Sequence, residues 1–158
     1  MSDAASQAVP LRVFLSGIIQ GSAVDASHHR QDYRDELRRI IGTVHPDAEV
    51  ICPVELNPNS AAYDEALAQA TFFRELELAA SADVTVAYAP VATMGTAVEM
   101  LRAFEAGHPV LTISPMAHNW AIRFLSTRVF PDLAAFRAFV DGGGLRAVLA
   151  RARAGALR

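Results

Sequence analysis

Apolar and polar residues follow one another along this chain in blocks that predict strands and helices in turn. Short apolar runs bounded by polar or turn-forming residues predict five buried strands. These runs cover residues 11–16, 49–52, 83–88, 109–114 and 128–130. Between and after them, apolar residues recur three or four positions apart, which predicts helices. The helices are expected at residues 32–44, 63–80, 96–106, 119–126, 133–140 and 145–154, with residues 55–62 as a loop.

The alternation of strands and helices predicts the fold class. Strands separated by helices of this length form parallel βαβ units with right-handed crossovers. We therefore expect an α/β fold, a three-layer doubly wound sheet of about five parallel strands of the Rossmann or flavodoxin type. Residues 11–158 are expected to form a single domain, and residues 1–10 a flexible terminus. Ligands of such folds bind at the carboxyl ends of the strands, which directs attention to the loops at 16–21, 53–60, 89–96 and 114–120.

Composition narrows the classes of function. The 158 residues are 52% hydrophobic, and 14 basic against 17 acidic residues give a formal net charge of −3. This balance argues against a surface that binds nucleic acid or an anionic membrane. Residues 1–10 lack the pattern of a signal peptide, and no apolar run approaches the roughly 20 residues of a membrane span, so we expect a cytoplasmic protein. The single cysteine, Cys52, excludes an internal disulfide and is expected to be a small buried residue.

The chain contains no lysine, which excludes several kinds of chemistry. A lysine Schiff base, a lysine general base and the phosphate-binding lysine of a P-loop are all ruled out. Arginine, which supplies every basic side chain, does not act as a base near neutral pH. The sequence also lacks a GxSxG nucleophile motif and a thiol next to a histidine. Carboxylates, histidines, hydroxyls and backbone amides remain, and no metal or cofactor is expected.

The motif MGTAVE at residues 94–99 is the first candidate for chemistry. A glycine and a hydroxyl at a helix start present free backbone N–H groups, which suit an anion or a ribosyl oxygen. Glu99 follows, away from an expected apolar stripe of Ala97, Met100, Leu101 and Phe104. By itself the motif favours a simpler interpretation, in which Thr96 and Glu99 form a capping box at the helix start.

Four short motifs occur together in order: LSG at 15–17, ADV at 82–84, MGTAVE at 94–99 and GHPV at 107–110. The arrangement resembles the nucleoside 2-deoxyribosyltransferase family, including its nucleotide N-glycosidase relatives, over residues 12–140. The resemblance implies that Glu99 attacks C1′ of the sugar, expels the base and forms a covalent glycosyl-enzyme. A second base then captures the sugar in a transferase, and water does so in a hydrolase. A carboxylate suits this step because the transition state resembles an oxocarbenium ion.

The same resemblance suggests roles for further residues. Glu75 lies where the family carries an aspartate that contacts substrate, although a solvated helix face would also explain it. Ser16, Gly17, Thr93, Gly95 and Thr96 are expected to cradle the sugar or its phosphate. The family's transferases commonly carry a tyrosine where this chain has Phe14, which slightly favours hydrolysis. Some nucleotide-specific relatives have an arginine where this chain has Gln20, which weakens the case for a phosphorylated substrate.

Asn119 and Trp120 are the candidates in the loop that follows the fourth predicted strand. An indole can stack on a base, and an amide can bind a sugar hydroxyl. In the family, this region often completes the site of a neighbouring subunit, so we expect a homodimer or a higher homo-oligomer. The alternative is structural: Trp120 would pack into the core or an interface, and Asn119 would cap the next helix.

The expected partner is a small-molecule nucleoside or nucleotide, and two other functions remain open. One is a non-catalytic nucleotide-sensing module on the same fold, in which Glu99 would bind ribose hydroxyls. The other is a glycohydrolase that cleaves the nicotinamide–ribose bond of an NAD-type dinucleotide. The residues do not distinguish between bases, between ribose and 2′-deoxyribose, between a free and a phosphorylated 5′ position, or between hydrolysis and transfer.

Overall fold

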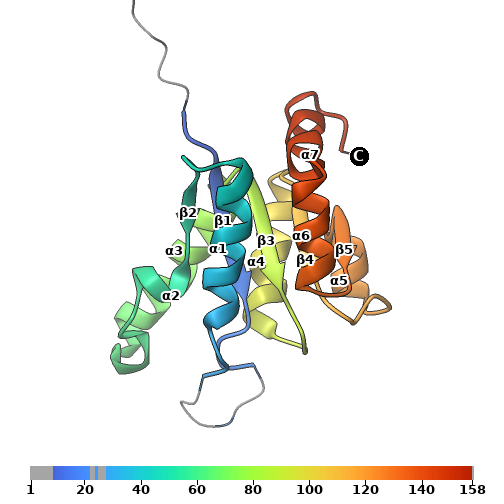
Figure 1. Cartoon of the computed structure of the whole chain (residues 1–158). Helices are drawn as coiled ribbons and strands as arrows, with labels where there is room; N and C mark the ends of the chain where they lie inside the picture. Colours follow the sequence, from blue (N-terminus) through green and yellow to red (C-terminus); the bar gives the residue numbers. More distant parts are fainter. Residues whose placement is uncertain (1–8, 22–23, 25–27, 158) are drawn as a thin grey trace, which may run out of the picture.

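The computed structural model describes residues 9–21, 24 and 28–157, and a parallel sheet lies at its centre (Figure 1). The sheet has five strands in the described part of the chain, in the order β2-β1-β3-β4-β5. All pairings are parallel. The strands are β1 (Arg12–Gly17), β2 (Glu49–Ile51), β3 (Val84–Tyr88), β4 (Val110–Ile113) and β5 (Arg128–Phe130).

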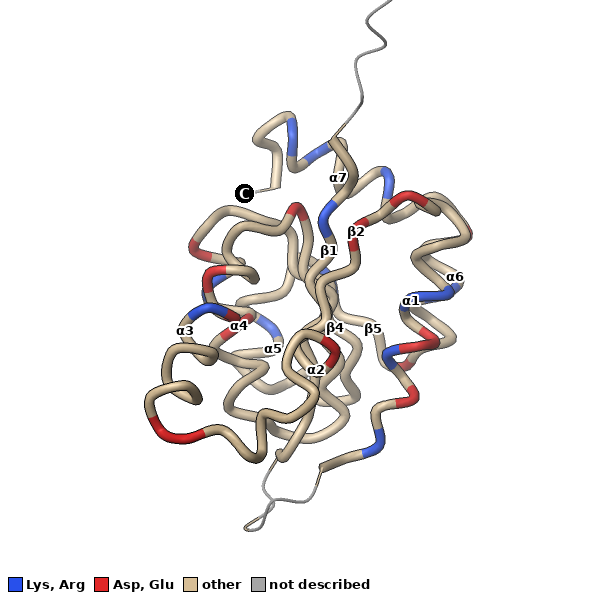
Figure 2. Tube along the Cα trace, turned by 90° about the vertical axis from the view of Figure 1, so that its left-hand side faces the viewer, with Lys and Arg blue, Asp and Glu red and all other residues tan. Residues whose placement is uncertain are grey.

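Helices cover both faces of the sheet, which gives three layers. Figure 2 shows α3, α4 and α5 on one side and α1 and α6 on the other, and α7 packs beside α6. The helices are α1 (Asp32–Val44), α2 (Pro53–Leu56), α3 (Glu65–Ser81), α4 (Met94–Glu105), α5 (Trp120–Leu125), α6 (Leu133–Asp141) and α7 (Gly144–Arg153). The predicted fold class, a doubly wound α/β sheet, is confirmed.

The strand order reverses between β1 and β3. From β1 the chain passes to β2 on one side, whereas β3, β4 and β5 follow on the other. β2 is short, and its pairing with β1 ends where Phe14 faces Ile51. β1 continues beside β3 as far as Gly17, which faces Tyr88. The carboxyl end of β1 therefore projects beyond β2 at the position where doubly wound folds bind ligands.

The side chains of β1 alternate between the two faces of the sheet. Val13 and Leu15 face the layer of α1, α6 and α7 and pack in the largest core cluster. Phe14 points the other way and packs with Ile51, Ala79 and Ala82. Cys52, just beyond β2, is buried as predicted.

The structure corrects the start and the buried face of one predicted helix. α4 begins at Met94 rather than at residue 96. Its buried residues are Thr96, Met100 and Ala103, whereas Leu101, which the predicted stripe placed inside, is 39% exposed. Apolar residues lie on both sides of this helix, so apolarity alone did not identify the side that meets the sheet.

The predicted loop at 55–62 is partly helical, because it contains the end of α2 and a 3₁₀ turn, η1 (Ser60–Ala62). The predicted helix at 63–80 begins instead at Glu65, where the Asp64 carboxylate accepts a hydrogen bond of 2.8 Å from the Leu67 amide. Of the expected flexible terminus, residues 1–8 lie outside the described residues. None of the described helices is long and apolar enough to cross a bilayer.

Candidate active site

A cleft of about 460 Å³ opens at the carboxyl end of β1. Its walls come from the end of β1, from the segment around α2, from α3 and from the first two turns of α4. The cleft thus lies at the reversal of strand order, where the strand ends on each side leave room for a ligand. The C-terminus lies at the opposite end of the sheet (Figure 1).

Glu99 projects from the second turn of α4 into this cleft. The hydroxyl of Ser16, which is fully buried in β1, donates a hydrogen bond to the Glu99 carboxylate. The capping-box interpretation is wrong, because Thr93 rather than Thr96 precedes the first turn of α4, and Glu99 binds β1 instead. The hydroxyl of Thr93 makes no capping hydrogen bond among the described residues, so the first N–H groups of α4 remain available at the cleft.

The surroundings of Glu99 raise the pKa of its carboxyl group to about 7. Burial is the largest cause, because a charged carboxylate loses hydration there, and the neighbouring Glu75 carboxylate adds to it. The hydrogen bond from Ser16 and the positive charge of Arg34 act in the opposite direction. The carboxyl group therefore changes its charge near neutral pH.

Glu75 lines the same cleft from α3. The side-chain amide of Asn57 donates a 2.9 Å hydrogen bond to the Oε1 of Glu75, and the Tyr63 hydroxyl donates to the side-chain Oδ1 of Asn57 at 3.3 Å. Burial raises the pKa of Glu75, while the Asn57 hydrogen bond and the charge of Arg34 oppose this. The solvated-face interpretation of Glu75 is wrong, because the side chain is half-buried and has defined partners.

Four of the residues expected to cradle a sugar also line the cleft: Gly17, Thr93, Gly95 and Thr96. The buried Thr96 hydroxyl donates to the Thr93 hydroxyl at 3.4 Å. A Cβ at Gly17 would overlap the phenol of Tyr33, so a larger residue there would require the Tyr33 ring to shift. The structure thus gathers these residues with Glu75 and Glu99 around one space. Ser16, which was also expected to cradle the sugar, is fully buried, does not line the cleft and contacts Glu99 instead.

Asn119 and Trp120 do not line this cleft. The Asn119 side chain caps α5, accepting from the amides of Ala121 and Ile122 at 3.0 and 3.3 Å, as the structural alternative predicted. Asn119 also lines a separate apolar hollow of about 390 Å³ that lies against the start of α4. Trp120 is 76% exposed, so it is not a core residue of the protomer.

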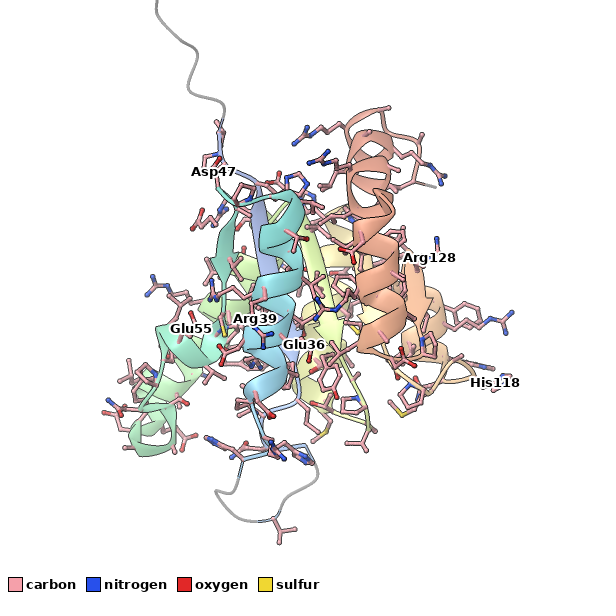
Figure 3. The ribbon with its side chains drawn as sticks, viewed as in Figure 1. Glu36, Arg39, Asp47, Glu55, His118 and Arg128 are labelled. Carbon is pink, nitrogen blue, oxygen red and sulfur yellow. The ribbon has the colours of Figure 1, made fainter. Side chains whose placement is uncertain are left out.

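Figure 3 shows how far this loop lies from one wall of the cleft. His118, from the loop before α5, points outward at one edge of the molecule, and Glu55 of α2 lies at the other. Within one protomer, Met116 and Asn119 line the apolar hollow but not the cleft, and the start of α4 lines both.

The sequence analysis missed Arg34, a residue that supports the site from α1. Its side chain is 4% exposed, and its guanidinium donates to the carbonyl oxygens of Leu15 at 2.9 Å and Gly17 at 3.1 Å. A signal was present, because Arg34 lies three and seven residues before Leu37 and Ile41, on the apolar stripe of its own helix. A charged residue on such a stripe indicates a buried polar contact. Asn57 and Tyr63 carried no comparable signal.

No family model matches this sequence, and no curated protein matches it. Among solved structures, the fold is similar to 2-deoxyribosyltransferase from the psychrotolerant bacterium Bacillus psychrosaccharolyticus, with a TM-score of 0.61 and 18% identity over 80% of this chain and 90% of that one. The CMP N-glycosidase BcmB of Clostridium botulinum aligns with a TM-score of 0.49 and 15% identity over 84% of this chain and 98% of that one. The similarity to 2-deoxyribosyltransferase confirms, at the level of the fold, the family resemblance that the motifs indicated.

Proposed function

We propose that this protein cleaves the N-glycosidic bond of a nucleoside or a nucleoside 5′-monophosphate, with Glu99 as the nucleophile. One observation carries the proposal. The Glu99 carboxylate lies in the ligand cleft of the fold, hydrogen-bonded by Ser16, and Glu75 faces the same cleft. The fold likeness to 2-deoxyribosyltransferase, a biocatalyst for the synthesis of nucleosides, supports the same substrate class.

The proposed reaction begins with attack of a Glu99 oxygen on C1′ of the sugar. The C1′–N bond breaks as the C1′–O bond forms, and the electron pair of the broken bond stays on the base nitrogen. The departing base takes up a proton from a neighbouring acid. Glu75 suits that role because burial raises its pKa and so favours the protonated form. A water molecule or a second base then attacks C1′, gives its proton to the Glu75 carboxylate and releases Glu99 as a free carboxylate.

Phe14 slightly favours hydrolysis as the fate of this intermediate. The Phe14 ring is fully buried on the face of the sheet that α3 covers, and it brings no hydroxyl to the nucleophile. The test supplies one nucleoside together with an excess of a different free base. We expect free base and free sugar, or sugar phosphate, as the products. An exchanged nucleoside as the main product would show that the protein is a transferase.

A panel of nucleosides, their 5′-monophosphates and NAD tests the proposal, with released base measured by chromatography. Glu99→Gln keeps the size of the side chain but removes the nucleophile, and we expect turnover to fall by roughly 10³-fold or more. Glu77→Gln is the matched control, because Glu77 lies on α3 with its carboxylate paired to Arg102 at the surface. We expect this control to retain wild-type turnover.

The outcomes separate the alternatives. Cleavage of NAD alone would favour the dinucleotide glycohydrolase. Binding of nucleotides without cleavage of any of them would favour the sensing module. Full activity in Glu99→Gln would contradict the nucleophile assignment.

A further inference from the structure

The end of β1 has backbone carbonyl groups that no neighbouring strand satisfies on the β2 side. The β2 pairing stops at Phe14, so β1 runs on beyond it as a projecting edge. Side chains from α1 and the residue before it take the place of the missing strand. Arg34 donates to the carbonyls of Leu15 and Gly17, and Gln31 donates to that of Ile18 at 3.1 Å. These bonds fix the segment that carries Ser16.

Ser16 lies between the two carbonyls that Arg34 binds. Its neighbours Leu15 and Gly17 are both held by one planar guanidinium, through Nη1 and Nη2 respectively. A forked donor of this kind fixes two acceptors in a defined relative orientation, which a lysine cannot do. The direction of the Ser16 hydroxyl, and hence its hydrogen bond to Glu99, depends on that backbone.

The guanidinium of Arg34 is buried without a carboxylate in direct contact. None of the ion pairs within 4.0 Å in the described part of the chain includes Arg34. Its other partners are neutral: the side-chain Oε1 of Gln31 at 2.7 Å, the sulfur of Cys52 at 3.6 Å and the face of the Tyr33 ring. A buried charge is costly unless it is compensated. Its charge acts to lower the pKa of both cleft carboxyl groups, Glu75 and Glu99, and that of the Tyr33 phenol.

We propose that Arg34 is a positioning residue for the reaction at Glu99, which it supports by clamping the backbone on both sides of Ser16 and by placing a permanent positive charge near the two cleft carboxylates. The inference rests on the proposed function, because the reaction at Glu99 gives this support its purpose. Arg34 does not line the cleft, so it acts through Ser16 and through its charge rather than by touching substrate.

Two substitutions separate the clamp from the charge. Arg34→Met removes both, and Arg34→Lys keeps the charge but loses the fork. For Arg34→Met we expect the apparent pKa of Glu99 to rise by about one pH unit, which by itself lowers turnover near pH 7 by about fivefold, and the loss of the clamp adds to that fall. For Arg34→Lys we expect a smaller change in pKa but a fall in kcat of at least about fivefold, with KM changed by less than about twofold. Arg39→Met and Arg39→Lys are the matched controls, because Arg39 is exposed on the same helix (Figure 3).

Two readouts keep this inference separable from the proposed function. One is the pH profile of kcat. The other is the titration of the Glu99 carboxyl carbon by NMR, assigned by its disappearance in Glu99→Gln, which needs no substrate. The other titratable groups around the end of β1 and the cleft are Tyr33, Cys52, Tyr63, Glu75, Tyr88 and His28, and comparison with the Arg39 variants separates their contribution.

A wild-type protein that cleaves no nucleoside, combined with a raised Glu99 pKa in Arg34→Met, would overturn the proposed function while supporting the electrostatic role of Arg34. An unchanged Glu99 titration in a folded Arg34→Met variant would overturn that role. If Arg34→Met does not fold, the kcat of Arg34→Lys tests the clamping role of Arg34 by itself. A kcat equal to that of Arg39→Lys would overturn this role.

Discussion

The two helical layers of this protein bury their apolar residues very differently. In the layer of α1, α6 and α7, large side chains such as Leu37, Ile40 and Phe136 are fully buried against the sheet. In the layer of α3, α4 and α5, the buried residues include the small Ala79 and Ala103. Met100 of α4 is also fully buried, but several large apolar side chains of that second layer point outward.

The outward-facing residues of the second layer are numerous. Phe73 is 57% exposed, Trp120 76%, Phe124 57% and Leu101 39%. Exposed apolar residues on one layer are typical of a surface that another molecule covers. The first layer therefore supplies most of the packing that stabilises the protomer. The second supplies both cleft carboxylates and a surface compatible with the homo-oligomer that we predict.

A matched pair of leucines gives the largest expected difference in stability between the layers. Leu37→Ala removes a fully buried side chain from α1, and Leu101→Ala a part-exposed one from α4. We expect Leu37→Ala to lower the free energy of unfolding by about 2–5 kcal/mol and Leu101→Ala by less than about 1 kcal/mol. Urea denaturation followed by circular dichroism measures both. Equal losses would show that the second layer is packed as tightly as the first.

The raised pKa of Glu99 makes the stability of the protein depend on pH. The folded protein keeps the Glu99 proton up to about pH 7, whereas a carboxyl group with the ordinary value of 4.5 releases it earlier. The stabilisation that results from the bound proton is complete below the unfolded-state pKa of 4.5. It is lost as the pH rises through the folded-state pKa of about 7. Relative to Glu99→Gln, wild-type stability should therefore fall by at most about 3 kcal/mol over this window.

Denaturation curves at several pH values check this expectation. The lowered pKa of His45 acts in the same pH range, and the difference between wild type and Glu99→Gln removes its contribution. Glu77→Gln, which changes only a surface carboxylate, should follow wild type. A constant difference between wild type and Glu99→Gln across the window would mean that Glu99 titrates normally.

Gly17 tests the contact between the first layer and the cleft. A methyl group at this position would overlap the Tyr33 phenol, which donates to the Ile18 carbonyl at 3.2 Å. We expect Gly17→Ala to cost about 1–3 kcal/mol of stability and to reduce turnover, because the backbone next to Ser16 must shift. Gly95→Ala is the control for stability, since a Cβ there meets no atom within 4 Å. Wild-type stability in Gly17→Ala would show that the Tyr33 ring moves freely.

Trp120 should have the smallest effect on protomer stability, although it lies on the predicted interface. Because Trp120 is mostly exposed, we expect Trp120→Ala to change the free energy of unfolding of the protomer by less than about 0.5 kcal/mol. We expect it to weaken self-association, which sedimentation velocity measures. A wild-type protein that sediments as a monomer at its working concentration and is fully active would refute the oligomer and the role of residues 116–120 at its boundary.

The sequence by itself determined the order of the elements and the fold class. Buried strands such as VTVAY in β3 consist almost entirely of apolar and β-branched residues, and this local pattern is independent of tertiary contacts. The motif at residues 94–99 likewise pointed to Glu99, through its glycine and its resemblance to a known family. Both kinds of information are contained in short stretches of chain.

Only the tertiary structure decided which neighbours each side chain has. Ser16 and Glu99 are 83 residues apart, and the hydrogen bond between them exists because β1 and α4 meet at one end of the sheet. The capping box could not be excluded from sequence, since Thr96 and Glu99 have the right spacing for it. The burial of Arg34 depended on β2 ending early, which left carbonyls of β1 to be satisfied. Contacts between distant segments follow from the packing of whole layers, which no single stretch of sequence encodes.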